Sequence, residues 1–260
     1  MKILPALAAL IVALPLAACE KGADGKSVVN LTRPDDAFGR KVRAYLLEHP
    51  EVIEEAVAKL QEKKQAEAAA TSKAELAAAR KAIPLHRAAL ERDARDFVAN
   101  PGGSITLVQF FDYNCGYCKL AAPQIVQLIE ENPDIRFVFK EFPIFGEASD
   151  TAAKISLTAA GKAHGLQLYQ AWMAEKPLDE AAIDRRLKAI GLDPAEMRKA
   201  AAAPEIAKQV ADVRELAMAL KIQGTPAFIV GDTLIPGADM EALKAAIAEA
   251  KGGGRKVAEG

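Results

Sequence analysis

Two short hydrophobic runs in the middle of the chain predict the strands of a sheet. Residues Ile105–Phe111 are almost all apolar, and residues 135–142 carry large side chains at alternate positions. Runs of this length, bounded by turn residues, are typical of buried strands. The residues between them, from Cys115 onward, have apolar positions at helical spacing. A strand, a helix and a strand within about forty residues predict a right-handed crossover between parallel strands.

The C-terminal half has a long helical stretch followed by a hairpin. Residues 147–222 are helical in pattern, and glycines and prolines divide them into several helices. Two short apolar runs, 227–230 and 233–235, are joined by Gly231-Asp232, which is typical of a tight hairpin. A last amphipathic helix carries Met240, Leu243 and Ile247, and we expect a disordered tail over residues 252–260.

The N-terminal half predicts a helical arm over residues 35–96. Its apolar positions step by three and four, as in a helix seam, and residues 61–80 are then almost entirely alanine and charged residues. A helix of this kind either lies on the surface of a larger domain or joins copies of the chain in an oligomer. We favour the oligomer. Residues 85–98 predict a shorter helix that leads into the next domain. The seam consists of Leu46, His49, Ile53, Ala56 and Leu60.

The first residues predict export. Residues 1–18 have one lysine and a short apolar run, which is typical of a signal peptide. The run ends Leu16-Ala17-Ala18-Cys19, which resembles a bacterial lipobox, so we expect Cys19 to be lipidated. A plain signal peptide is the alternative. Residues 19–34 are small and polar and predict a flexible tether.

Charge and size narrow the class of protein. The formal net charge is −1 over 260 residues, and no basic patch is evident, so nothing points to nucleic acid. The 51% of hydrophobic residues suffice for one good core and an extra element.

The chemistry is concentrated in Cys115-Gly116-Tyr117-Cys118. Two cysteines three apart at a helix start lie on one face, close enough to form a disulfide. The amide groups of a helix N-terminus lower the pKa of a cysteine there, so Cys115 is the expected nucleophile. Cys118, one turn deeper, is expected to resolve the mixed disulfide, and Gly116 and Tyr117 to tune the pair. No further ligands stand at metal-site spacing, so we expect neither metal nor cofactor.

These residues carry a resemblance to a known family. The segment 110–119, with Pro123 and the segment Gly224-Thr225-Pro226-Ala227-Phe228, resembles the DsbA-like branch of the thioredoxin superfamily over residues 97–251. The resemblance implies an α/β thioredoxin fold with a helical insertion at about 147–222. It also implies a redox-active Cys115–Cys118 disulfide, and a cis bond between Thr225 and Pro226 that faces it.

The arm carries a second, shorter resemblance. Residues 43–52 are similar to the N-terminal arm of trimeric ScsC-like disulfide isomerases, which implies a homo-oligomer such as a trimer. The sequence also departs from DsbA-like oxidases, because Gln109 stands where several of them have a buried acid. Asp112, Lys140 and Glu141 are then the nearest charges, either as a proton route or as surface residues at strand edges. Gln109 and Thr225 both favour reduction or isomerisation over oxidation.

The sequence therefore predicts an exported thiol–disulfide oxidoreductase on the periplasmic side of a bacterial membrane. Its expected partners are unfolded or misoxidised exported proteins and a membrane thiol–disulfide redox partner, with the membrane itself contacted through the N-terminal lipid. The alternatives are a DsbA-type oxidase, a copper(I) carrier that uses the two thiolates, and a holdase-like lipoprotein.

Overall fold

The computed structural model describes residues 37–258, with side chains up to residue 252. The predicted signal peptide, Cys19 and the tether lie outside the described residues. Within the described part, no helix is both long enough and apolar enough to cross a bilayer. Contacts divide the chain into two units, residues 1–62 and 63–260.

The described part of the first unit is helical, as predicted. Helix α1 covers Ala37–Glu48, and α2 begins at Glu51 and runs to Ala82 in the second unit. The break falls at His49-Pro50, because a helix usually ends at or before the residue that precedes a proline. Helix α1 buries none of its side chains, and α2 buries only Ala79. The arm therefore exposes its apolar seam.

The second unit is built on a five-stranded sheet in the order β1-β3-β2-β4-β5. Strands β2 and β3 are parallel and joined through helix α4, which confirms the predicted crossover. Strands β4 and β5 form the predicted hairpin, and Gly231 in its turn has a φ of 59°. The strands are β1 (Phe97–Ala99), β2 (Ile105–Phe111), β3 (Ile135–Glu141), β4 (Ala227–Val230) and β5 (Thr233–Pro236).

The helix predicted over residues 85–98 is wrong in its second half. A short 3-10 turn at Ile83–His86 leads into α3, Arg87–Glu91, and Phe97–Ala99 then forms β1. Strand β1 pairs antiparallel with β3, with Phe97 opposite Phe139. Pairing with a distant strand outweighs the local helical pattern here, and residues with aromatic and β-branched side chains suit the strand.

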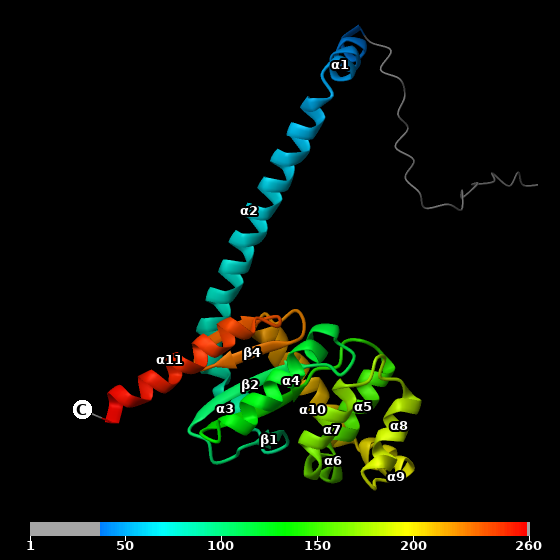
Figure 1. Cartoon of the computed structure of the whole chain (residues 1–260), viewed down its shortest axis with the longest axis vertical. Coiled ribbons are helices and arrows are strands. Elements are labelled where there is room, and N and C mark those ends of the chain that lie inside the picture. Colours follow the sequence, from blue (N-terminus) through cyan, green and yellow to red (C-terminus); the bar gives the residue numbers. More distant parts are fainter. Residues whose placement is uncertain (1–36, 259–260) are drawn as a thin grey trace, which may run out of the picture. The chain divides into compact units, whose positions relative to one another are not determined.

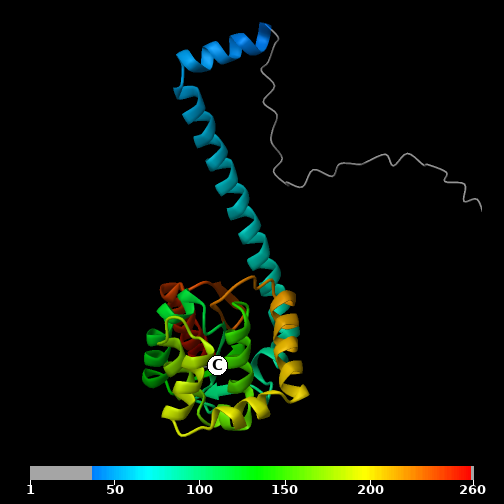
Figure 2. The same cartoon turned by 90° about the vertical axis from the view of Figure 1, so that its right-hand side faces the viewer.

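Helices cover both faces of the sheet. The alternating side chains of β2 divide between them, since Leu107 and Phe111 belong to one core cluster and Val108 and Phe110 to the other. The first face packs against α4 (Gly116–Glu131) and α11 (Met240–Ala258), and the second against α3 and α10 (Pro204–Ala219). Figure 1 shows α4 and α11 beside the sheet, and Figure 2 shows α10 in orange along one side.

The helical insertion is confirmed between β3 and β4. The insertion comprises α5 (Glu147–Leu157), α6 (Ala159–Ala163), α7 (Gly165–Met173), α8 (Glu180–Ala189), α9 (Pro194–Ala201) and α10. Helices α5, α7, α8 and α9 of the insertion join the core cluster that also holds both cysteines. Helix α11 runs from Met240 to Ala258, whereas the sequence predicted a disordered tail from residue 252.

Candidate active site

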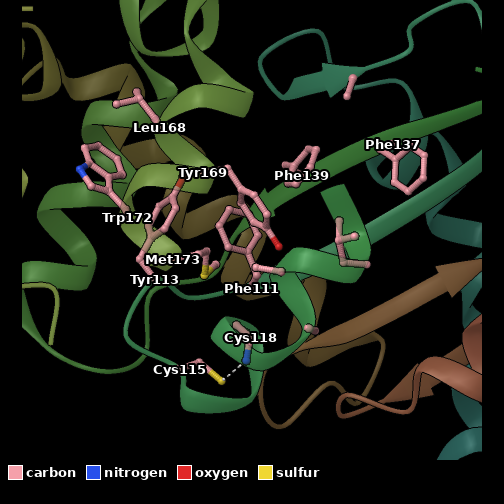
Figure 3. Close-up of a cluster of buried hydrophobic side chains, with 14 of the residues drawn as sticks. Phe111, Tyr113, Cys115, Cys118, Phe137, Phe139, Leu168, Tyr169, Trp172 and Met173 are labelled. Carbon is pink, nitrogen blue, oxygen red and sulfur yellow. Dashed lines mark hydrogen bonds between the residues drawn. The ribbon is translucent and has the colours of Figure 1, made fainter. Parts of the chain in front are cut away.

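Cys115 is the N-cap of helix α4. Its backbone is extended, with φ −69° and ψ 118°, and the helix begins at the next residue. The Cys118 N–H donates to Cys115 Sγ over 3.3 Å, the contact drawn as a dashed line in Figure 3. The sulfur therefore accepts a hydrogen bond from an N–H that has no partner within the helix.

The two sulfurs differ in acidity. The pKa of Cys115 is lowered to about 6, chiefly because the Cys118 thiol donates to it, with help from the N–H groups of Cys118 and Tyr117. Burial opposes this shift and is outweighed. Burial raises the pKa of Cys118 far above its ordinary value. One sulfur is therefore suited to attack as a thiolate, and the other stays a thiol until a reaction deprotonates it.

Both cysteines are free thiols in the structure and both are buried. Cys118 is 0% exposed, which agrees with its predicted deeper position. Cys115 is only 2% exposed. Its thiol donates to the Thr225 carbonyl oxygen over 3.1 Å, and this loop covers it.

A groove of about 780 Å³ leads to Cys115. Part of its wall is apolar and accessible, since Tyr117 is 67% exposed and Leu120 66% exposed. Phe145, which follows β3, and Thr225 also line it. A peptide that reaches the sulfur must therefore pass over these side chains.

The second predicted segment lies at the same place. The Thr225–Pro226 peptide bond is cis, as the resemblance implied. The Thr225 hydroxyl oxygen is buried and has no hydrogen-bond partner within the described residues. The Pro226 carbonyl accepts from Gly237 N over 2.8 Å, which ties the loop to the residues after β5. The structure thus brings together Cys115 and Thr225, which are 110 residues apart in sequence.

Asp112 organises the loops around the cysteines. Its carboxylate accepts from the N–H groups of Asn114 (2.6 Å), Ile144 (2.7 Å) and Phe145 (2.9 Å), and from the Ser149 hydroxyl (2.7 Å). It is 1% exposed, so its alternative reading as a strand-edge surface residue is wrong. The carboxylate ties the loop before Cys115 to the loop after β3.

Lys140 and Glu141 are also buried rather than on the surface. Lys140 pairs with Asp96, and both side chains are 1% exposed. Glu141 Oε1 accepts from the Tyr113 hydroxyl over 2.9 Å, while Oε2 is buried without a partner. Burial raises the pKa of Glu141 well above its ordinary range. Sequence reasoning missed Tyr113 and Asp96, whose only local signal is their place beside a strand.

A cluster of aromatic side chains lies next to the cysteines (Figure 3). Tyr113 meets Phe111 and Trp172 edge to face, each at 5.1 Å between ring centroids. Gln109 stands where several DsbA-like oxidases have a buried acid. It is itself buried and donates to the Tyr169 hydroxyl over 3.2 Å. Gln109 therefore places a neutral pair in the core.

A metal site is not apparent in the described part of the chain. No group of three or more histidine, cysteine, aspartate or glutamate side chains gathers there in a way that would hold an ion.

Comparison with known families agrees with this fold. Residues 106–248 match the family described as DSBA-like thioredoxin domain, and residues 36–67 match the one described as Copper resistance protein ScsC N-terminal domain. The first match spans more than half of the chain. The chain therefore belongs to the DsbA-like thioredoxin family and carries an N-terminal domain of the ScsC type.

Solved structures give the same assignment. The chain is 33% identical to Proteus mirabilis ScsC in a transitional conformation, over 82% of this chain and 97% of that one, with a TM-score of 0.59. It is 35% identical to a thioredoxin-like oxidoreductase from Silicibacter pomeroyi DSS-3, over 64% of this chain and 97% of that one, with a TM-score of 0.60.

The curated relatives are longer proteins. The chain is 27% identical over 171 residues to Na(+)/H(+) antiporter NhaA 3 of Salinispora tropica, covering 64% of this chain and 26% of the antiporter. The chain thus spans about a quarter of the length of the first curated relatives that it matches.

Proposed function

We propose that the protein is an exported thiol–disulfide oxidoreductase that reduces and isomerises disulfides in other proteins. Cys115 is the nucleophile, Cys118 the resolving thiol, and Thr225 and Pro226 the loop that meets the client. One observation carries the proposal: Cys115 Sγ caps helix α4 with its pKa lowered to about 6, beside a second thiol whose pKa burial raises.

The first step is attack by the Cys115 thiolate on a client disulfide. An S–S bond forms between Cys115 and the client, the client's own S–S bond breaks, and the leaving sulfur takes up a proton. With a pKa of about 6, Cys115 is mostly ionised at neutral pH, so no separate base is needed to activate it.

The mixed disulfide then has two fates. In isomerisation, a client thiolate attacks the client sulfur, and Cys115 leaves unchanged in oxidation state. In reduction, Cys118 loses its proton to the departing client sulfur and attacks Cys115. A Cys115–Cys118 disulfide forms and the client gains two electrons, which a membrane thiol–disulfide partner replaces.

The acidity of Cys115 supports this direction of electron flow. A pKa of about 6 lies nearer to that of thioredoxin, about 7, than to that of DsbA, about 3.5. A less stabilised thiolate gives a less oxidising disulfide. Gln109 supports the same direction, since a neutral amide bonded to the Tyr169 hydroxyl stands where several DsbA-like oxidases have a buried acid.

The helical arm and the predicted signal peptide bear on the oligomeric state and the location of the protein. The exposed seam on α1 and α2 favours a homo-oligomer, such as a trimer, that brings several Cys115 sulfurs to one client. Proteus mirabilis ScsC shares this arm and domain at 33% identity. Another relative is described as a periplasmic thioredoxin-like protein from Salmonella enterica serovar Typhimurium, which supports a periplasmic location, with Cys19 as the lipid anchor.

The test is recovery of ribonuclease from its scrambled disulfide form. We expect the reduced protein to restore ribonuclease activity, and Cys115→Ser to abolish this. Cys118→Ser is expected to retain isomerisation, because that path returns Cys115 without it. Efficient oxidation of reduced ribonuclease together with no unscrambling would instead identify a DsbA-type oxidase.

Copper(I) binding is the second candidate, and the name of the family matched by residues 36–67 favours it. The two adjacent thiols suit a soft cation. The first readout is Cu(I) competition with a chromophoric chelator. A carrier would hold the ion tightly and leave scrambled ribonuclease unchanged.

A further inference from the structure

A second groove lies between helices α4 and α7, next to the groove that holds Cys115. It measures about 510 Å³, and the two helices contact each other along it. Its lining from α4 is Ala122, Pro123 and Val126, and from α7 and its end Gln170, Met173 and Ala174. Most of these side chains are small or apolar, so the groove suits an apolar side chain.

Two lysines stand where the two grooves meet. Lys119 and Lys176 line both the α4–α7 groove and the groove of Cys115. Lys119 is half-buried, and its ammonium group donates to the Glu175 carbonyl oxygen. Burial lowers the pKa of Lys119, so a carboxylate beside it would stabilise its charge.

The acid next to Lys176 in the sequence, Glu175, is already engaged. Glu175 Oε1 accepts from Arg186 over 2.7 Å and from Arg185 over 3.0 Å. Within the described residues, neither Lys119 nor Lys176 forms an ion pair, and the carboxylate of Asp112 is held by its four donors. The junction of the grooves is therefore positively charged on a chain whose formal net charge is −1.

We propose that the α4–α7 groove binds the client segment next to the captured cysteine, and that Lys119 and Lys176 select segments that carry an acidic residue beside a large apolar one. The apolar side chain enters the groove and the carboxylate lies at the two lysines. This inference rests on the proposed function, because Cys115 holds the client while the segment binds. It names the substrate class: extended segments that are acidic and apolar close to their cysteine.

The experiment measures rates with short peptides of one cysteine, each blocked as a mixed disulfide with thionitrobenzoate. In each peptide the cysteine stands between the two residues of one pair. The pairs are Asp and Leu, Lys and Leu, and Asp and Ser. The Cys115 thiolate attacks the peptide sulfur, the S–S bond to thionitrobenzoate breaks, and the coloured thiolate is released. The reduced full chain is mixed with each peptide at low salt and in about 0.5 M salt.

We expect the Asp-Leu peptide to react about fivefold faster than the Lys-Leu peptide at low salt, the size of a favourable partly exposed ion pair. Salt is expected to reduce this ratio to below about twofold. The Asp-Ser peptide is expected to be slower than Asp-Leu, because it leaves the groove empty.

Matched variants assign the effect to the junction. Lys176→Gln is expected to lower the Asp-Leu to Lys-Leu ratio, while Lys188→Gln, an equal charge change on an exposed face of α8, keeps it. Ala174→Glu, at an exposed position of the groove, is expected to reverse the preference. Because Lys176 and Ala174 are both exposed, these variants test the proposal even if Lys119→Gln does not fold.

Two failures are distinguishable. Equal rates for all peptides, each well above the rate with the mixed disulfide of glutathione and thionitrobenzoate, overturn this inference and leave the proposed function standing. The inference is equally overturned if Lys176→Gln and Lys188→Gln behave alike. Rates no higher than with the mixed disulfide of glutathione and thionitrobenzoate for every peptide overturn the proposed function itself.

Discussion

The Cys115 thiol donates a hydrogen bond to the backbone carbonyl oxygen of Thr225, 3.1 Å away. This contact joins the start of helix α4 to the loop before β4. It exists only while the sulfur carries its proton. When Cys115 ionises or bonds to a client sulfur, the carbonyl is free to accept from a client N–H, as an edge strand would. The protonated thiol therefore occupies the site of client pairing, and ionisation of Cys115, which prevails at neutral pH, frees it.

The pH dependence of alkylation tests the acidity of Cys115. We expect the rate with iodoacetamide to rise through a midpoint near pH 6 and to level off above about pH 7, since only the thiolate reacts. Cys118→Ala removes the strongest stabilising hydrogen bond and is expected to raise the midpoint by about one unit or more. A midpoint near 8.5 in the parent protein would contradict the assignment of Cys115 as an activated nucleophile.

The same shift predicts how the stability of the reduced protein depends on pH. The folded pKa of Cys115 lies below its unfolded value of about 8.5, so the thiolate's contribution is fully present above that pH. It is lost as the pH falls to about 6. Urea unfolding of the reduced parent and of Cys115→Ser, at pH 5.5 and 8.5, is expected to show the parent's relative advantage only at the higher pH.

Asp112→Asn is expected to lower the free energy of unfolding by about 2–3 kcal/mol, because an amide leaves at least one of the four buried donors without an acceptor. The loops beside Cys115 depend on this carboxylate, so the rate of mixed-disulfide formation should fall as well. Ser149→Ala removes only one of the four bonds and serves as a milder control. A stability unchanged in Asp112→Asn would show that water replaces these contacts.

The buried carboxyl group of Glu141 lowers the stability of the folded protein by an amount that depends on pH. Its folded pKa is raised, so protonation favours the folded state and stability falls as the pH rises above about 4.3 towards the folded value. Glu141→Gln keeps an oxygen for the Tyr113 hydroxyl and cannot ionise. We expect this variant to flatten the decline in thermal stability between pH 5 and 8, with little difference near pH 4. Identical profiles for variant and parent would contradict the buried, raised group.

The Lys140–Asp96 pair predicts a strong asymmetry between single and double variants. Both side chains are 1% exposed, so Lys140→Met alone leaves a buried carboxylate without its partner and is expected to cost about 3–5 kcal/mol. The double variant with Asp96→Leu removes both charges and should recover most of that loss. Chemical denaturation measures both, and equal losses would contradict the pairing.

The exposed arm predicts concentration-dependent assembly. Ile53 is 49% exposed and Leu60 51% exposed on α2, and both belong to the apolar seam of the arm. Replacing both by lysine is expected to reduce the sedimenting mass to that of a single chain. Gln61→Lys, a charge added to the polar part of α2, is the control. A parent protein that already sediments as a single chain at micromolar concentration would contradict the oligomer.

Much of the site was predictable because its signals are local. The run before Cys115, the two cysteines one helical turn apart and the Gly224-Thr225-Pro226 segment each identify themselves within a few residues. The burial of Asp112, Lys140 and Glu141 was not, because a charged residue at a strand end has the same local pattern on a surface as in a core. Their partners Ser149, Asp96 and Tyr113 lie in other elements.

By itself, the sequence determined the strand–helix–strand unit, the position of the cysteines at a helix start and the helical nature of the arm and insertion, since periodicity and turn residues act over a few positions. Tertiary structure alone decided that residues 97–99 form a strand, that Thr225 covers Cys115, and that two lysines stand where the grooves meet. These features depend on contacts between segments far apart in the chain, and the free energy of such contacts is absent from any local pattern.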